Sequence, residues 1–122
     1  VYECTGFHTE LFRFPGGSAW AKALLRTDPT EAIRDAGYEW IEWSCDVFDN
    51  GVAGKSAAEI QGTGVWEVKQ LDIAVVLSHD WNSNTVSAFP AIVKQLQEAG
   101  YVFLPLYPES VTMGENTKIM FS

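Results

Sequence analysis

The spacing of short β-branched and aromatic segments constrains the fold of this chain more than any other feature of its sequence. Four such segments recur about 30 residues apart, the length of a strand, a crossover helix and a second, parallel strand. They span residues 11–14, 38–45, 73–78 and 102–106. Each is predicted to form a strand, and the spacing predicts that the strands pair in parallel within one α/β domain.

Helical segments separate these predicted strands. Helices are expected at residues 19–25, 56–70 and 85–99, and a further helical turn is expected from Asp28, a capping residue placed before Pro29. The last helix has the clearest 3.6-residue period, and Gly37 and Gly100 stand where a helix C-terminus leads into a strand. The predicted order is therefore βαβαβαβ, with four βα-type units.

The length of the chain limits how these units can close. The chain has 122 residues, whereas a complete (β/α)8 barrel needs about 250. Residues 1–109 are therefore expected to form either a small open α/β sheet or about half of a barrel, and residues 110–122 a loop or loosely packed tail. Because the chain starts at Val1 rather than at a methionine, we expect a fragment or a processed product.

Charge and composition exclude several classes of partner. Sixteen acidic residues against eight basic ones give a net charge of −8, which repels nucleic acid and anionic lipid. Apolar runs such as residues 73–77 are too short to span a bilayer. Cys4 and Cys45 can form at most one bridge and lack the C-x-x-C spacing, so the redox compartment stays open. We expect no nucleic-acid partner and no membrane span.

Polar and aromatic residues cluster at the carboxyl ends of three predicted strands, where parallel α/β folds bind their ligands. The clusters are residues 12–18, 43–50 and 77–82. In the first, Arg13 precedes the sequence Pro-Gly-Gly, whose lack of side-chain cover would let a ligand approach the backbone amides. The same residues also fit a tight turn that carries a surface arginine.

The other two clusters supply carboxylates and a histidine. His79, next to Asp80, fits a general acid or base whose pKa is set by a carboxylate, and it also fits a structural histidine. Asp46 and Asp49 fit groups that orient a histidine or hold a cation, and they also fit ordinary turn formers.

Five tryptophans are many for this length, and four of them fall into two expected groups. Trp43 lies at the end of one predicted strand and Trp81 follows another, so both could present aromatic faces to sugar rings. Trp40 and Trp66 are expected in the core. His8 lacks an acidic or histidine partner at helical spacing, so it is expected to be structural or exposed.

Taken in order, the three clusters resemble the polysaccharide deacetylase family, carbohydrate esterase family 4, also called the NodB homology domain. Residues 12–17 (Phe-Arg-Phe-Pro-Gly-Gly) resemble its third motif, residues 43–49 (Trp-Ser-Cys-Asp-Val-Phe-Asp) its fourth and residues 76–80 (Val-Leu-Ser-His-Asp) its fifth. Residues 89–103 also resemble its last helix and strand. The resemblance covers residues 6–106 and implies a distorted (β/α), TIM-like barrel, of which this chain would be the C-terminal half.

The family's enzymes remove acetyl groups from N-acetylglucosamine in peptidoglycan or chitin, or from acetylated xylan, with a divalent metal held by one Asp and two His. The resemblance implies that His79 is the general acid that protonates the leaving amine and that Asp49 tunes it. The other implied roles are orientation of the catalytic base by Arg13, oxyanion stabilisation by the amide of Gly16, and a pocket for the acetyl methyl group formed by Trp43 and Leu77.

The family's first two motifs supply the base and the metal ligands, and both should precede Arg13. They are an Asp-Asp pair and a His-x-x-x-His sequence, but only twelve residues precede Arg13, and His8 has no partner at that spacing. We therefore expect the divalent metal, with zinc as the expected ion, to be bound in the full-length parent protein and by no residue of this chain. The chain alone is expected to be inactive.

An alternative function uses the same residues. A non-catalytic glycan-binding or interaction module could keep the wall of the groove without the metal, and an unrelated four-strand α/β domain is a third possibility. A half barrel would expose strand edges and an apolar face, so the expected partners, besides a glycan, are the missing N-terminal half or a second copy of the chain. The family's substrates imply an extracellular or cell-envelope location for the parent protein.

Overall fold

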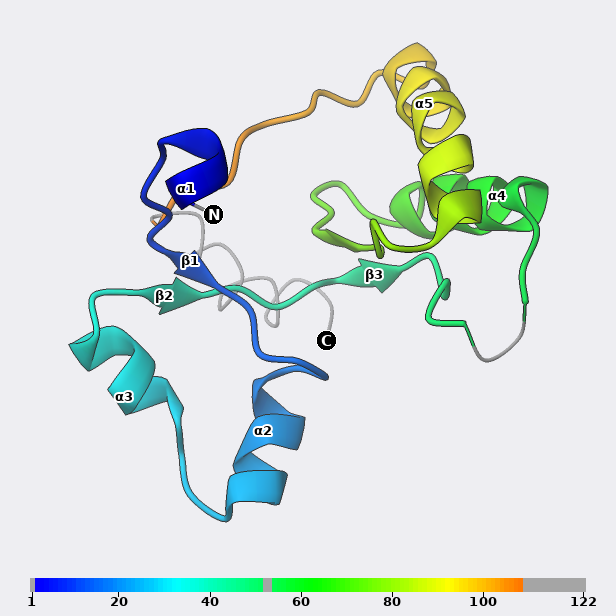
Figure 1. Cartoon of the computed structure of the whole chain (residues 1–122). Helices are drawn as coiled ribbons and strands as arrows, with labels where there is room; N and C mark the ends of the chain where they lie inside the picture. Colours follow the sequence, from blue (N-terminus) through cyan, green and yellow to red (C-terminus); the bar gives the residue numbers. More distant parts are fainter. Residues whose placement is uncertain (1, 52–53, 109–122) are drawn as a thin grey trace. The chain divides into compact units, whose positions relative to one another are not determined.

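The structure is a computed structural model that describes residues 2–51 and 54–108. The chain divides into two compact units, and Figure 1 labels most of their elements. Unit 1 combines the described residues of Val1–Glu42 with those of Pro105–Ser122, and unit 2 is Trp43–Leu104.

Unit 1 contains a pair of short parallel strands. β1 (Leu11–Phe12) pairs with β2 (Glu39–Trp40), so that Leu11 is opposite Glu39. The chain between them forms α2 (Ser18–Leu25) and α3 (Thr30–Asp35), and α1 (Tyr2–Thr5) precedes them. The parallel pairing of the first two predicted strands is therefore confirmed over two residues of each.

Aromatic side chains pack around this strand pair. Phe14 is buried, and its ring meets the ring of Phe12 edge-on, with centroids 4.9 Å apart, and that of Trp40 at 6.5 Å. The guanidinium of Arg34, on α3, lies 4.3 Å from the centroid of the Trp40 ring, within the range of a cation–π contact. Phe14, the second phenylalanine of the first cluster, therefore has a packing role.

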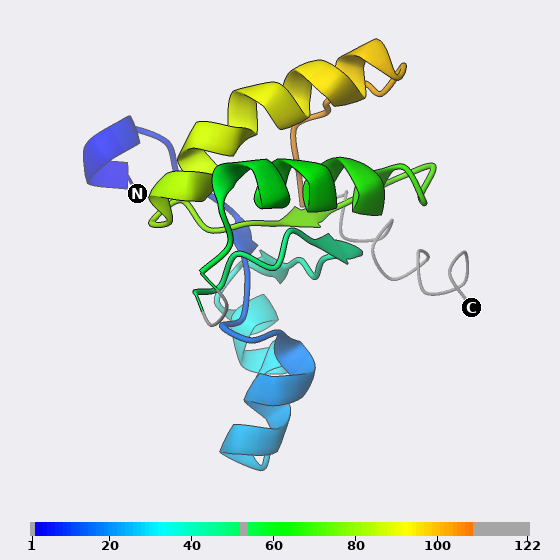
Figure 2. The ribbon, with the colours of Figure 1, turned by 90° about the vertical axis from the view of Figure 1, so that its right-hand side faces the viewer.

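Unit 2 contains a second parallel pair with two longer helices. β3 (Cys45–Asp46) pairs with β4 (Val76–Leu77), with Cys45 opposite Val76 and Asp46 opposite Leu77. The crossover between them is α4 (Ala57–Val68), and α5 (Ser83–Glu98) follows β4. Figure 2 shows α4 and α5 side by side. Helix α4 starts with a capping box, in which Ser56 and Glu59 each accept the backbone N–H of the other.

The core of unit 2 lies where α4 meets β3 and α5. Its buried members are Cys45, Val47, Ile60, Val68, Ala88, Ile92 and Leu96. Gly64 lets the three elements approach closely, because a Cβ at this position would lie 3.1 Å from Val47 and 3.2 Å from Ile92. The predicted helices at residues 56–70 and 85–99 are confirmed within two residues at each end.

Two strand predictions need correction. Residues 38–45, predicted as one strand, form two short ones, since β2 pairs with β1 in unit 1 and β3 pairs with β4 in unit 2. Residues 102–106, predicted as the fourth strand, form no strand. Val102 and Leu104 are 79% and 77% exposed, and a strand needs a partner that residues 2–51 and 54–108 do not provide.

The tryptophan assignments also divide. Trp40 is half-buried beside Phe14 and Arg34, whereas Trp66 is 61% exposed, so the predicted place of Trp66 in the core is wrong. The buried residues of α4 are Ile60, Gly64 and Val68, four apart on one face, and Trp66 lies two positions from that stripe. His8 was predicted to be structural or exposed, and it is exposed. Its ring stacks on that of Tyr2, with centroids 3.9 Å apart.

Both cysteines are free. Cys4 is exposed in unit 1, whereas Cys45 is buried in the core of unit 2. Burial raises the pKa of the Cys45 thiol to about 11, with smaller contributions from the charges of Glu67 and Asp46. In the part of the chain that the structure describes, none of the helices combines the length and apolar content needed to cross a bilayer. The predicted tail at residues 110–122 lies outside the described residues.

Candidate functional site

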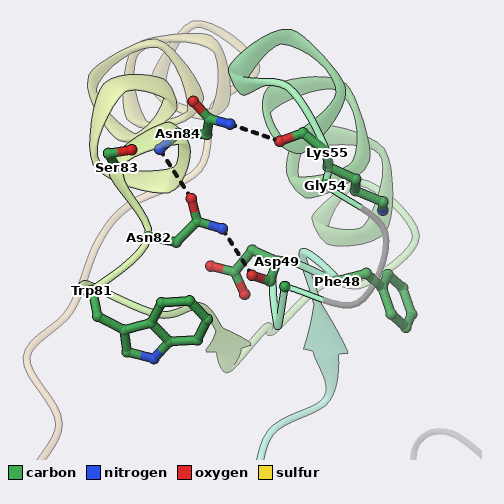
Figure 3. A pocket seen from close by; sticks show the side chains of 9 residues that line it. Phe48, Asp49, Gly54, Lys55, Trp81, Asn82, Ser83 and Asn84 are labelled. Atoms are coloured by element: carbon green, nitrogen blue, oxygen red, sulfur yellow. Dashed lines mark hydrogen bonds between the residues drawn. The ribbon is translucent and has the colours of Figure 1, made fainter.

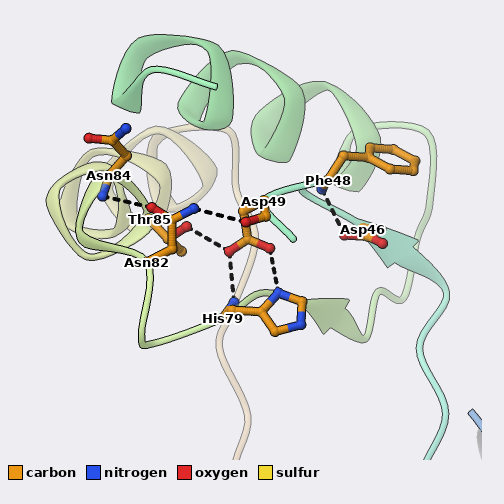
Figure 4. A network of polar contacts seen from close by, with 7 residues as sticks. All are labelled: Asp46, Phe48, Asp49, His79, Asn82, Asn84 and Thr85. Atoms are coloured by element: carbon orange, nitrogen blue, oxygen red, sulfur yellow. Dashed lines mark hydrogen bonds and ion pairs between the residues drawn. The ribbon is translucent and has the colours of Figure 1, made fainter. Parts of the chain in front are cut away.

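The candidate site of unit 2 is a carboxylate–imidazole pair formed by Asp49 and His79, drawn in Figure 4. Atom Oδ1 of Asp49 lies 2.6 Å from Nδ1 of His79, and Oδ2 accepts the backbone N–H of the same histidine at 2.7 Å. The Asp49 side chain is fully buried, whereas the His79 side chain is 26% exposed. One face of the pair is therefore held by the protein while the imidazole reaches the surface.

Thr85 completes the coordination of the carboxylate. Its hydroxyl donates a hydrogen bond to Oδ2 of Asp49 at 2.6 Å, and Thr85 is itself 4% exposed. Burial alone would raise the pKa of Asp49, but the hydrogen bonds from His79 and Thr85 outweigh it and lower that pKa. Asp49 is therefore ionised at neutral pH.

The ionised carboxylate decides the tautomer of the histidine. A carboxylate only accepts hydrogen bonds, so Nδ1 of His79 carries the shared proton, and Nε2 is left as the ring nitrogen for other partners. Nε2 can then take up a proton to give an imidazolium that Asp49 stabilises, and it can release that proton to a leaving group. The pair thus has the arrangement of a general acid with an orienting carboxylate.

The loop after β3 places Asp49 through a backbone turn. Asp46 accepts the N–H of Phe48 at 2.7 Å, and Phe48 adopts a left-handed conformation with φ of +53°. That conformation is unfavourable for a bulky residue, and here it leaves Phe48 exposed between Val47 and Asp49, which are 1% and 2% exposed. Asp46 is therefore a turn former, and the partner of His79 is Asp49 rather than the adjacent Asp80, which is exposed.

Asn82 joins the same loop to the start of α5. Its side-chain oxygen accepts the N–H of Asn84 at 3.0 Å, which caps the helix, and its amide donates to the carbonyl of Asp49 at 2.8 Å. The first turn of α5 therefore holds both the backbone of Asp49, through Asn82, and the carboxylate, through Thr85.

A cavity of about 260 Å³ has Asp49 among its lining residues. Figure 3 shows Trp81 on one side of it and Phe48 with Lys55 on the other. Trp81 is 64% exposed, and its ring is tilted against that of His79 with centroids 5.3 Å apart. The amide of Asn84 donates to the carbonyl of Lys55 at 2.9 Å, which links the two walls. An aromatic face beside amide and hydroxyl groups suits a sugar ring.

The first cluster lies in unit 1 and forms a tight turn before α2. Arg13 and Gly16 are both exposed, and Gly17 donates its N–H to the carbonyl of Phe14 at 2.9 Å. Gly16 has φ of +72°, and a Cβ there would lie 3.2 Å from the ring of Trp20. The turn needs glycine at this position. Arg13 forms no ion pair with another residue of the described part of the chain.

Trp43 and Leu77, the predicted pocket for an acetyl methyl group, both lie in unit 2. Trp43 is half-buried two residues before β3, and Leu77 is buried at the end of β4, two residues before His79. Leu77 is not a member of the core cluster that α4 and α5 form with β3. Their role as a methyl pocket stays a prediction.

The residues 2–51 and 54–108 hold no group of three His, Cys, Asp or Glu side chains that could bind a metal ion. Asp49 and His79 are occupied with each other, and His8 is stacked on Tyr2. This part of the chain therefore does not fit the divalent metal that the resemblance implies.

Two residues of the site were not assigned a role from the sequence. Thr85 was expected only as the start of a helix, and Asn82 only as part of the third cluster. The capping preference of asparagine predicts a helix start near Asn82, but nothing in the sequence shows that the next turn faces Asp49, because that contact joins residues 36 positions apart.

Three solved structures are similar to this chain. The catalytic domain of the peptidoglycan N-acetylglucosamine deacetylase from Eubacterium rectale aligns with a TM-score of 0.76 at 25% sequence identity, covering 87% of this chain and 50% of that one. A polysaccharide deacetylase from Bacillus cereus aligns with a TM-score of 0.71 at 28% identity, covering 89% and 53%. A CE4 esterase from Streptococcus mutans, at 23% identity, has a TM-score of 0.59 and covers 81% and 44%, which shows similarity of fold alone.

These similarities define the class of the fold. The chain shares its fold with polysaccharide deacetylase catalytic domains and spans about half the length of the solved chains that it matches. Its resemblance to carbohydrate esterase family 4, inferred from the three motifs, is thereby confirmed. No family model matches the sequence, and no curated protein matches it either.

Proposed function

We propose that this chain is the part of a polysaccharide deacetylase catalytic domain that supplies the general acid. The observation that carries the proposal is the Asp49–His79 pair, in a chain that is similar to a peptidoglycan N-acetylglucosamine deacetylase over 87% of its length. The parent protein would hydrolyse acetyl groups from N-acetylglucosamine in peptidoglycan or chitin.

His79 would act on the leaving group. When the acetamide is hydrolysed, the C–N bond breaks and the amine leaves as a neutral molecule only if it gains a proton. Protonated Nε2 of His79 would donate that proton while Asp49 keeps the imidazolium oriented and charge-compensated. Arg13 and the amide of Gly16 would orient the base and stabilise the oxyanion, and Trp43 and Leu77 would receive the acetyl methyl group.

The base and the divalent metal would come from outside the described residues. We propose a half-barrel arrangement, which the exposed segment at residues 102–106 supports. This segment has the composition of a strand, yet Val102 and Leu104 are almost fully exposed. In a complete barrel it would pair with a strand that the rest of the parent protein provides.

Acetate release by the parent protein tests this function. With N-acetylchitooligosaccharide or acetylated peptidoglycan as substrate, His79→Ala should lower kcat at least about 100-fold. Asp49→Asn should lower it less, because the histidine remains. Asp80→Asn, an exposed neighbour, serves as the control and should leave kcat unchanged. A parent protein that releases acetate equally well with His79→Ala contradicts the proposal.

The chain alone is proposed to be inactive and to bind no catalytic metal. Calorimetric titration of the 122-residue chain with Zn²⁺ should give no tight, stoichiometric binding. Tight binding would show that the metal site has been misplaced.

A second candidate function is a non-catalytic glycan-binding module, and the exposed Trp81 beside the cavity favours it. Chitooligosaccharide titration followed by tryptophan fluorescence separates the two functions. A binding module should give a saturable change that Trp81→Ala removes and that Trp66→Ala, the loss of a similarly exposed tryptophan on α4, preserves. The half-domain proposal expects no saturable change.

The location and partners of the parent protein follow from its proposed substrates. Peptidoglycan and chitin lie outside the cytoplasm, so we propose an extracellular or cell-envelope location. The proposed partners of the chain are the remaining half of the barrel or a second copy joined through exposed strand edges. A native mass spectrum of the chain that contains monomer alone would rule out the second copy.

A further inference from the structure

The carboxylate of Asp49 is held at both oxygens by three donors. Oδ1 faces Nδ1 of His79 at 2.6 Å, and Oδ2 accepts the N–H of His79 at 2.7 Å and the hydroxyl of Thr85 at 2.6 Å. The first two donors come from the loop after β4, whereas Thr85 belongs to the first turn of α5. Among the residues that the structure describes, only Thr85 therefore fixes the carboxylate from a second element.

Rotation of the carboxylate makes this second element important. The terminal torsion of an aspartate is broad and roughly two-fold, so bonds from the His79 loop alone leave the plane of the group free to move with that loop. Two bonds that reach Oδ2 from different directions fix that plane, and Oδ1 is then held at Nδ1 of His79. Thr85 suits the task because its branched side chain has few rotamers and because its hydroxyl is buried beside the acceptor.

We propose that Thr85 is a positioning residue for the general acid: its hydroxyl fixes the Asp49 carboxylate so that His79 keeps its proton on Nδ1 and its Nε2 available. The inference deepens the proposed function and rests on it, because the proposed function is what makes His79 a general acid. Thr85 acts through Asp49 and has no contact with the reacting atoms of its own.

Other charged groups near the pair come from the loops that flank it. Lys55 lines the cavity next to Asp49, and its Nζ lies 3.5 Å from the hydroxyl of Thr63 and 5.1 Å from the centroid of the Phe48 ring. Asp80 follows His79 and is exposed. Among the residues that the structure describes, neither forms a hydrogen bond or an ion pair with Asp49 or His79. Orientation of the pair therefore depends on Thr85 and the backbone.

Imidazole NMR on the ¹⁵N-labelled chain tests the inference without requiring activity. In the unmodified chain, His79 should show the Nδ1–H tautomer with a strongly downfield ring proton. Thr85→Val keeps the shape of the side chain and removes the donor, so the downfield proton should be lost and the two tautomers should mix. Thr85→Ser restores a hydroxyl and should restore the signal. A folded Thr85→Val chain with an unchanged His79 spectrum overturns the proposal.

Two controls come from the same molecule. Ser87→Ala removes another hydroxyl of α5, one that bonds within the helix to the carbonyl of Ser83, and it should leave the His79 spectrum unchanged. His8 is exposed, stacks on Tyr2 and reports general changes in every sample. A Ser87→Ala spectrum that changes as much as that of Thr85→Val contradicts a specific role for Thr85.

A measurement on the unmodified chain covers the case in which Thr85→Val does not fold. The hydroxyl proton of Thr85 donates into a buried carboxylate, so it should exchange with water far more slowly than that of Thr30, which donates to the exposed Asp28 at 2.7 Å. Equal exchange rates overturn the inference. Full activity of the parent protein with His79→Ala would overturn the proposed function instead, so the two failures are distinguishable.

Discussion

The two sites formed by the three clusters that carry the resemblance are built in different ways. Around Asp49 and His79, in unit 2, buried or partly buried side chains from three segments of the chain form hydrogen bonds with one another. Around Arg13 and Gly16, in unit 1, the side chains are exposed and backbone conformation defines the turn. A site of the first kind specifies its geometry within the unit, whereas a site of the second kind presents a backbone shape and a charge to something else.

This difference fits the proposed division of labour. A proton donor must hold one tautomer and one ring orientation, which requires neighbours that are themselves fixed. An amide that stabilises an oxyanion needs only an exposed N–H on a rigid turn. In the proposed function, this chain alone can orient the proton donor. Oxyanion stabilisation also requires a substrate and a base.

The largest expected effect separates the two clusters by stability. Asp49→Asn places an amide where the buried carboxylate accepts three hydrogen bonds, so the free energy of unfolding should fall by about 3 kcal/mol. Arg13→Ala, at an exposed side chain, should change it by no more than about 0.5 kcal/mol. Urea denaturation followed by circular dichroism measures both. Equal losses in the free energy of unfolding would contradict the proposed difference between the two sites.

A smaller loss is expected at the turn in unit 1. Gly16→Ala must adopt a left-handed φ and push against Trp20, so we expect a loss of about 2 kcal/mol. Gly6→Ala is the matched control, because Gly6 has a similar φ of +68° but no atom within 4 Å of the added Cβ. It should cost about 1 kcal/mol. Thermal unfolding measures the stability lost in each variant, and the difference between the two losses gives the cost of the contact with Trp20.

Part of the dependence of stability on pH should come from Asp49. Its pKa is lowered in the folded chain, so its contribution is complete above the ordinary aspartate value of about 3.9 and is lost as the pH falls through the folded value. The urea midpoint of the unmodified chain should therefore decline below about pH 4, and that of Asp49→Asn should decline less. Parallel declines in the two chains would show that other carboxylates dominate.

The smallest effect concerns salt. The hydrogen bond from Lys22 is the main cause that lowers the pKa of Asp28 to about 2, and both side chains are largely exposed, so added salt should move that pKa back toward its ordinary value. The pKa of the buried Asp49 should respond much less. Carbon-13 NMR of the aspartate carboxyls between low and 1 M salt compares them. A salt response of Asp49 as large as that of Asp28 would contradict its burial.

Local signals predicted the helices well and the strands only in part. The period of α5 and the position of Gly100, which ends it with φ of +93°, depend on neighbouring residues, so the sequence carries them directly. Strand pairing depends on distant partners. Residues 102–106 have a suitable composition but no partner among the described residues, and residues 38–45 change partner midway.

The candidate site shows the same limit. The resemblance paired Asp49 with His79, which lie 30 residues apart, because the two residues belong to two motifs of the family. His79 alone would not have identified its partner. It did not identify Thr85 or Asn82, since their contacts arise when α5 packs beside the loop after β3. Trp66 was misplaced because its type suggested burial while its position on α4 decided otherwise.

The buried Cys45 makes the opening of unit 2 measurable by thiol labelling. Thiol reagents attack the thiolate, so a cysteine that is enclosed by the core and has a pKa of about 11 reacts only when unit 2 opens. Cys4 is exposed and can be blocked first. The rate at which Cys45 then becomes labelled reports how often the packing of α4 on β3 loosens, without any engineered probe.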